Sequence, residues 1–239
     1  MYHSVTFGEK NTWDDWFLIP TSRPVFNPPK VKTMYVSIPG SNKIVDLTES
    51  LTGEATYEYR QGSMEFLVDN GHGEWYDLYS NIMDYLHGQQ MKAILEDDPS
   101  YYYEGRFSVN QWKSEPHNSK IVIDYYVAPF KMERFSSLED WFWDPFNFET
   151  GIIREYANLT VEKSSPVTVI IEPTKLSVVP IIIANITAGS TMTVVYGEVT
   201  RDLVNGENEF ADLVINNSLK ELLFTGEGTV SIDYRGGRL

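Results

Sequence analysis

Short stretches rich in valine, isoleucine, threonine and tyrosine follow one another along most of the chain, separated by glycine and proline. Strands of a few residues that end at turn-forming residues are typical of antiparallel β-structure. In the first half, this pattern predicts strands at MKAIL (91–95), YYYEGRFSV (101–109) and SKIVIDYYVAPF (119–130). The chain is therefore expected to have a mainly β fold.

One segment, EWYDLYSNIMDYLHG (74–88), has a different period. Its apolar residues recur at helical spacing, at Trp75, Leu78, Tyr79, Ile82, Met83 and Leu86. This spacing puts them on one face of an amphipathic helix. Gly88 suits the left-handed position that commonly ends a helix. The sequence therefore predicts one helix that packs through a single apolar stripe.

From residue 158 on, the chain again alternates between strand-like stretches and turns. These stretches are LTVEK (159–163), VTVIIEP (167–173), SVVPIIIANI (177–186), TMTVVYG (191–197), ADLVINN (211–217), KELLFTG (220–226) and GTVSIDY (228–234). Seven strands at short spacing predict a β-sandwich. An aromatic stretch at 134–157 separates the two halves, and we interpret it as an ordered connector. We therefore place a first domain at 1–133 and a second at 134–239.

The amino-acid composition excludes several classes of function. The 239 residues carry 34 acidic and 19 basic side chains, a net charge of −15, and no cysteine. Specific binding to duplex nucleic acid needs clusters of lysine and arginine, and the sequence has none. A disulfide framework and thiol catalysis are excluded. The longest apolar run, VVPIIIA (178–184), is too short to span a membrane, so we expect a soluble protein without a membrane partner.

The candidates for catalysis are three acidic pairs, Asp14–Asp15, Asp97–Asp98 and Glu139–Asp140. A glycosidase needs two carboxylates facing each other across a cleft, whereas neighbours on a strand point to opposite faces. Structural acids are the better interpretation, and Asp97 and Asp98 are expected in the turn before the tyrosine-rich strand. The four histidines, at positions 3, 72, 87 and 117, lack metal-ligand spacing. We therefore predict no catalytic residues, no metal site and no cofactor.

Exposed aromatic residues could serve a binding function. Trp13 and Trp16 flank an acidic pair, and Trp141 and Trp143 flank a phenylalanine. Tryptophan is enriched in protein contacts, stacks on sugars, and also fills cores. The sequence leaves these three interpretations open, with core packing favoured.

Four motifs, in order, resemble the distal tail proteins of siphophages. VDLTESLTGEATYEYRQGSMEF (45–66) is similar to the D-x-T-E-x-L-T-G…Y…R…F stretch of that family, and YLHGQQMKAILEDDPSYYYEGRFSV (85–109) to its next segment. WFWDPFNFETGII (141–153) resembles the junction into the second domain, and GTVSIDYRGGRL (228–239) the C-terminal end. The resemblance covers nearly the whole chain.

The resemblance implies an N-terminal β-sandwich with one helix and a protruding hairpin, and a C-terminal galectin-like β-sandwich. It also implies a homo-hexameric ring that joins the tail tube to the tail tip or baseplate of a phage or prophage. The partners would be other copies of the chain, the tail-tube protein and the tail-tip or baseplate proteins. DNA would pass through the lumen without specific binding, and the protein would reach the virion tail after synthesis in the bacterial cytoplasm.

Contacts between subunits are expected in the stretch 45–60, which we interpret as an extended hairpin with a turn at Gly53. The candidate residues are Asp46, Leu47, Thr48, Glu49, Leu51, Thr52, Gly53, Tyr57 and Arg60. If the lumen shares the negative sign of the chain, it would repel the phosphates of passing DNA. Two alternatives remain, a carbohydrate-binding module with coplanar exposed aromatics and a hydrolase fragment with two convergent carboxylates.

Overall fold

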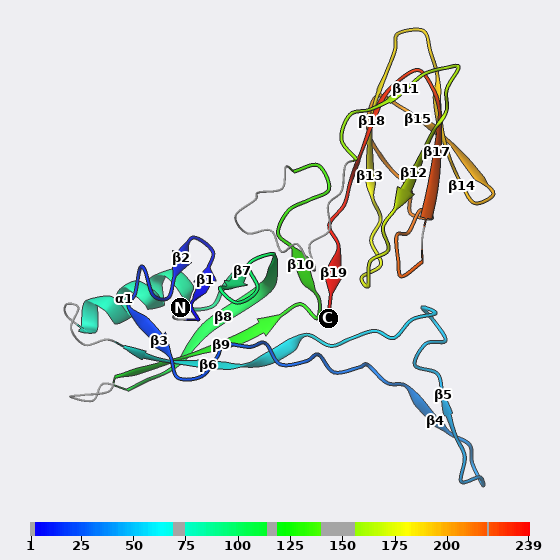
Figure 1. Ribbon diagram of the computed structural model, residues 1–239. Helices are drawn as coiled ribbons and strands as arrows, with labels where there is room; N and C mark the ends of the chain where they lie inside the picture. The colour runs from blue at the N-terminus through cyan, green and yellow to red at the C-terminus, as the bar shows by residue number, and fades with distance from the viewer. Residues whose placement is uncertain (1–2, 69–74, 114–118, 140–155, 219) are drawn as a thin grey trace. The chain divides into compact units, whose positions relative to one another are not determined.

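The computed structural model describes residues 3–68, 75–113, 119–139, 156–218 and 220–239. Within these ranges the chain is mainly β with one helix, which confirms the predicted fold class (Figure 1). The chain divides into two compact units, Met1–Lys131 with Leu239, and Met132–Arg238. We call them the first and second units and describe each separately.

A curved antiparallel sheet forms the body of the first unit. Its main path runs β2-β1-β7-β8-β9-β6-β3. The strands are β1 (Val5–Phe7), β2 (Lys10–Asn11), β3 (Leu18–Pro20), β6 (Arg60–Val68), β7 (Gln89–Leu95), β8 (Tyr101–Lys113) and β9 (Lys120–Val127). Alternate residues of the long strands β6, β8 and β9 are buried, as expected for a sheet with one face on the core.

The helix α1 (Trp75–Leu86) covers that core with the apolar stripe predicted from the sequence. Ile82 and Leu86 are fully buried against the same cluster as Phe107 of β8. Gly88 follows the helix with a φ of +72°, a conformation that costs glycine little because it has no Cβ. The predicted helix and its end are both confirmed.

The turn between β7 and β8 is also confirmed. The Asp98 amide donates to the Leu95 carbonyl, at 3.0 Å, and the Tyr101 amide donates to the Asp98 carbonyl, at 3.2 Å. Of the tyrosines that follow, Tyr103 belongs to the buried cluster, whereas Tyr102 points to the other face, with the Lys92 ammonium 4.4 Å from its ring centroid. The three tyrosines therefore do not form one stacking platform.

Two four-stranded sheets form the second unit, in the orders β11-β18-β13-β16 and β12-β17-β14-β15. The strands are β11 (Leu159–Val161), β12 (Val167–Ile171), β13 (Ile181–Ile186), β14 (Met192–Tyr196), β15 (Val199–Leu203), β16 (Gly206–Glu209), β17 (Lys220–Gly226) and β18 (Gly228–Asp233). Side chains of both sheets share one buried cluster, which is the packing of a β-sandwich. In addition, β10 (Lys131–Glu133) pairs with β19 (Gly237–Arg238).

Strand prediction in the second half was wrong in two places. The stretch 211–217 forms no strand, although Ile215 makes an isolated bridge with Val178 and is fully buried. The polar segments of β15 and β16 were missed. Each is the last strand of its sheet, so it has one partner and few buried positions, and it lacks the apolar alternation on which prediction depends.

Truncation of Tyr103 is expected to show how much the first core depends on the tyrosine-rich strand. Tyr103→Ala should lower the free energy of unfolding by about 3 kcal/mol, because it removes a buried aromatic ring. The matched control is Asp97→Ala with Asp98→Ala in the turn, which should cost no more than roughly 1 kcal/mol. Urea denaturation of both variants tests this, and equal losses would contradict it.

The two units are expected to fold independently. Residues 1–133 and 134–239, expressed as separate chains, should each unfold in one cooperative transition, because each has its own buried cluster. Thermal unfolding followed by circular dichroism is the measurement. A piece that unfolds without cooperativity would show that the domain boundary is misplaced.

Candidate protein-interaction site

Residues 28–58 leave the sheet as a long two-legged excursion, which we call the arm (Figure 1). Its legs are joined by backbone hydrogen bonds from the Lys32 amide to the Thr56 carbonyl and from the Glu58 amide to the Lys30 carbonyl, both at 2.8 Å. Farther out, β4 (Tyr35–Ser37) pairs with β5 (Ile44–Asp46). The arm is therefore an ordered ribbon that returns to the sheet at the start of β6.

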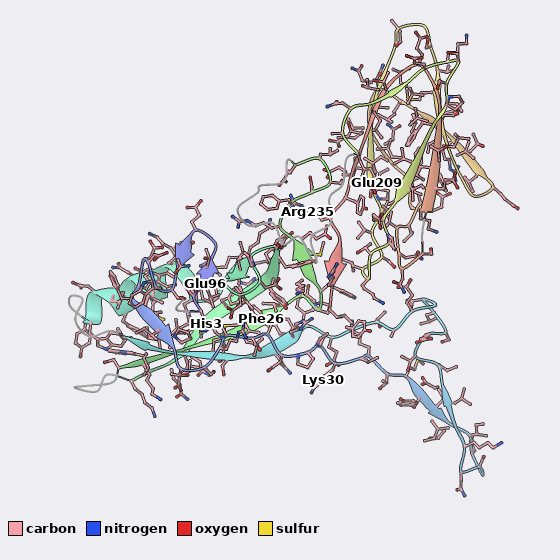
Figure 2. The ribbon with its side chains drawn as sticks, in the orientation of Figure 1. His3, Phe26, Lys30, Glu96, Glu209 and Arg235 are labelled. Atoms are coloured by element: carbon pink, nitrogen blue, oxygen red, sulfur yellow. The ribbon has the colours of Figure 1, made fainter. Side chains whose placement is uncertain are left out.

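The body of the first unit holds the base of the arm through Phe26 and Asn27. The buried Phe26 ring lies 4.0 Å from the Tyr103 ring and 4.8 Å from the Tyr125 ring, centroid to centroid (Figure 2). The Asn27 backbone amide donates to the Tyr125 hydroxyl at 2.9 Å, and the Asn27 side-chain amide donates to the Gln61 carbonyl at 3.0 Å. These contacts fix the point at which the arm begins.

Arg60 holds the returning leg at the same place. Its side chain is 5% exposed, and its guanidinium donates to the Pro129 carbonyl at 2.7 Å and to the Asn27 carbonyl at 3.1 Å. It also lies 5.3 Å from the centroid of the Tyr103 ring. Burial lowers the pKa of Arg60 from its ordinary value, because the charged form is partly desolvated. Arg60 thus joins both legs of the arm to the core.

Beyond its base the arm is not covered by the rest of the described chain. Every residue from 31 to 46 is exposed. Large hydrophobic side chains are nevertheless concentrated here and just beyond, at Val31, Met34, Tyr35, Val36, Ile38, Ile44, Val45 and Leu51. Exposed apolar residues scattered singly are normal, but a contiguous group usually marks an interaction surface.

The pairing of β4 with β5 places apolar groups on both faces of the ribbon. Val36 lies opposite Val45, so these two share one face, and Ile44 lies opposite Ser37 on the other face, which Tyr35 also joins. A two-stranded hairpin is marginally stable in water by itself. The ribbon therefore keeps apolar side chains exposed on both of its faces.

Charge is divided between the two legs of the arm. Residues 28–45 contain Lys30, Lys32 and Lys43 and no acid, whereas residues 46–58 contain four acids and no base. None of the three lysines forms an ion pair within the described part of the chain. In a chain with a net charge of −15, the outgoing leg is thus unusual in being both cationic and apolar.

The residues predicted to make subunit contacts lie mostly on the returning leg. Asp46 ends β5, and a series of turns from Leu47 to Gly53 follows, which includes Thr48, Glu49, Leu51 and Thr52. Leu51 is 90% exposed, and Gly53 has a φ of +74°. Tyr57 bridges to Val31, and its ring meets the Phe130 ring edge-on at 5.6 Å. Arg60 is different, because its buried side chain acts within the chain.

The position of the hairpin was predicted incorrectly. Residues 45–60 were expected to turn back on themselves at Gly53, but Ile44–Asp46 pairs instead with Tyr35–Ser37, around a loop at 38–43. The apolar residues of β4 were therefore missed. Their signal was the alternating run TMYVSI (33–38) followed by Pro-Gly-Ser-Asn, which is a common sequence pattern for a hairpin.

Carboxylates from the acidic pairs Asp14–Asp15 and Asp97–Asp98 have basic partners in the folded chain. The Asp97 carboxylate accepts from the Arg23 Nε at 2.7 Å and lies 2.9 Å from the His3 Nδ1, while Asp98 accepts from the Lys131 Nζ at 2.6 Å. Asp15 accepts from Lys10 Nζ at 2.7 Å. These carboxylates belong to ion pairs at turns, which agrees with the structural interpretation.

The remaining candidates give no second site among the described residues. Trp16 is buried in the first core, as favoured from the sequence, and Trp13 is half-buried. Asp140, Trp141, Trp143, His72 and His117 lie outside the described residues. In the ranges that the structure describes, no group of three His, Asp or Glu side chains could hold a metal ion. No helix in these ranges is long and apolar enough to cross a membrane.

The Asp97 ion pair is expected to produce a specific pH dependence. The hydrogen bond from Arg23 holds the pKa of Asp97 below its ordinary value of 3.8. This stabilisation is fully present above that value and is lost as the pH falls through the lower pKa of the folded state. Arg23→Gln should therefore lower the Tm slightly at neutral pH, and its difference from the unaltered chain should shrink below about pH 4. Thermal unfolding across this pH range tests the assignment, and a difference that grows in acid would contradict it.

Comparison with known proteins identifies a similar fold. No known family profile matches the sequence, and neither does any curated protein. Among solved structures, the crystal structure of Dit (gp 19.1) from phage SPP1, described as a paradigm of the hub adsorption apparatus in phages that infect Gram-positive hosts, matches with a TM-score of 0.62. The match covers 100% of both chains at 12% sequence identity. The chain therefore has the fold of a phage distal tail protein along its whole length, which confirms at the level of the fold the resemblance expected from its motifs.

Proposed function

We propose that this chain is a structural component of a long, non-contractile phage or prophage tail, a hub that joins the tail tube to the tail tip or baseplate. The observation that carries the proposal is the fold match, which extends over both units and leaves no part of either chain uncovered. The SPP1 protein is described as part of a hub adsorption apparatus, and the order of sequence motifs independently leads to the same family.

The hub is a ring of six copies. In a ring, each subunit presents two different surfaces that fit each other, so one side must reach its neighbour. The arm is suited to this role because it projects beyond the core, is fixed at its base by Arg60, and carries exposed apolar side chains on both faces. Contacts from residues 46–57 on its returning leg would add to those of the ribbon.

The partners of the ring are the tail-tube protein on one side and the tail-tip or baseplate proteins on the other. DNA passes through the lumen without specific binding, and acidic side chains on the lumen wall would repel its phosphates. The second unit is a galectin-like sandwich on the outside of the ring. The protein is made in the host cytoplasm and ends in the virion tail.

Co-expression with the adjacent tail-tube and tail-tip proteins tests the ring. The unaltered chain should enter a six-fold complex, with six times 27.4 kDa, about 164 kDa, from this protein. A chain in which Asn-Gly replaces residues 33–55 should fold but stay out of the ring. The two ends can be joined because Lys32 and Thr56 are already hydrogen bonded, and Asn-Gly favours a tight hairpin turn. Negative-stain images and sizing of the complex are the measurements.

Point variants provide a matched control. Val36→Ser with Ile44→Ser removes exposed apolar groups from the arm, whereas Ile170→Ser with Val204→Ser removes similarly exposed groups from the second unit. The arm pair should prevent ring formation and the other pair should not. If the unaltered chain never joins a ring, the hub assignment fails. If the arm variants join it as readily as the control, the role of the arm fails.

A further inference from the structure

The outer face of α1 carries negative charge, whereas the outgoing leg of the arm carries positive charge. Its exposed residues are Tyr76, Asp77, Ser80, Asn81 and Asp84, which lie on the side of the helix opposite the buried stripe. The helix contains two acids and no basic residue. Neither acid forms an ion pair in the part of the chain that the structure describes. This face is therefore anionic and has no basic partner among the described residues.

Tyr76 gives this face an aromatic anchor. Its side chain is 71% exposed, more than that of Tyr35, Tyr59 or Tyr126, the other strongly exposed aromatics among the described residues. Its ring is still held in place, because it meets the Trp112 ring edge-on at 5.6 Å. Trp112 is in turn stacked on Tyr79 at 4.2 Å. A held aromatic ring loses little conformational entropy on binding, and tyrosine is enriched among residues that dominate interface energy.

The arm offers the opposite charge together with apolar side chains. Lys30, Lys32 and Lys43 lie on a segment without acids, next to the exposed Val36 and Val45. An apolar ribbon with unpaired ammonium groups fits an aromatic residue surrounded by carboxylates better than it fits another cationic or purely polar surface. The same chain therefore carries a cationic and apolar surface on the arm and an anionic surface with an exposed tyrosine on α1.

We propose that the arm of one copy docks across the exposed face of α1 of a second copy, which lies next to it in the ring. This inference rests on the proposed ring and specifies its contact. The three lysines face Asp77 and Asp84, and the apolar side chains of the ribbon cover Tyr76. Because the arm and the helix are different surfaces of the same chain, each copy gives its arm to one neighbour and receives an arm from the other. That arrangement is the heterologous contact from which a closed ring is built.

Charge exchange tests the contact in the co-expressed tail complex. Lys30→Glu, Lys32→Glu and Lys43→Glu together should reduce ring incorporation by roughly tenfold or more, because like charges would then face each other across the contact. Asn81→Lys with Asp84→Lys should do the same from the helix side. These helix positions avoid the first turn, where a new lysine would oppose the helix dipole. A chain that carries all five substitutions should recover ring formation to within about threefold of the unaltered chain.

The matched control adds the same charge elsewhere. Thr200→Lys with Glu207→Lys changes the net charge as much as the helix pair, on exposed positions of the second unit. This variant should form rings normally, and all variants should keep the thermal midpoint of the unaltered chain. If the five substitutions fail to restore the ring, or if the control is as damaging as the helix pair, the docking site is wrong.

Chemical crosslinking supplies a second readout, which the absence of native cysteine makes clean. Val36→Cys and Ser80→Cys in one chain, treated with a short bismaleimide, should give a covalent ladder up to six copies. Each single-cysteine chain should give dimers at most. Rings without a ladder would overturn the proposed contact and leave the hub function standing. If the unaltered chain forms no ring, the hub function fails, and this contact fails with it.

Discussion

The buried guanidinium of Arg60 is the interaction on which the arm depends. A charge withdrawn from water is costly unless it is hydrogen bonded, and here two backbone carbonyls accept from Nε and Nη1 and an aromatic ring lies beside the guanidinium, while the buried Nη2 has no hydrogen-bond partner among the described residues. One carbonyl belongs to Asn27, where the outgoing leg starts, and the other to Pro129, after the last residue of β9. The side chain thus ties together three segments that are far apart in sequence. Without it, the base of the arm would be joined to the sheet mainly by Asn27 and the Phe26 ring.

In the first unit, the residues that stabilise the fold are different from those proposed to make contacts between subunits. Its sheet and α1 bury a contiguous core, so folding does not need the apolar side chains of the arm. The arm, in contrast, keeps those side chains exposed on a short ribbon with free edges. Such edges invite unwanted pairing between chains, and lysines on or beside an edge strand are a common protection against it. Lys32 and Lys43 flank the ribbon and fit this role, so the same charges would protect the free chain and select its partner.

The acidic residues serve different purposes in different places. Those of the turn after β7 are bonded to Arg23, His3 and Lys131, and they hold the N-terminal segment and Lys131 near that turn. Asp77 and Asp84 of α1 form no ion pair among the described residues and give that face of the helix its charge. The net charge of the chain therefore does not describe any single face, and complementarity between faces is possible even between identical acidic chains.

The sequence by itself determined the elements whose signal is local. The apolar stripe of α1, the strands β7, β8 and β9, and the turn at Asp97 and Asp98 all follow from periodicity or turn chemistry, and all are present. The ordered motifs also indicated a distal tail fold. Each of these features depends on the residues of its own segment and not on contacts with the rest of the chain.

Only the tertiary structure decided the rest, because it depends on residues distant in sequence. The partner of Ile44–Asp46 is β4, not the segment that follows it, and the polar strands β15 and β16 exist because a neighbouring strand offers them hydrogen bonds. Whether a side chain is exposed or buried also depends on residues distant in sequence. Val36 and Val109 are both strand valines, but Val109 lies on a sheet face that other elements cover, whereas Val36 lies on a ribbon that nothing else in the described chain covers. Arg60 is the reverse case, a charged residue whose burial no local pattern predicts.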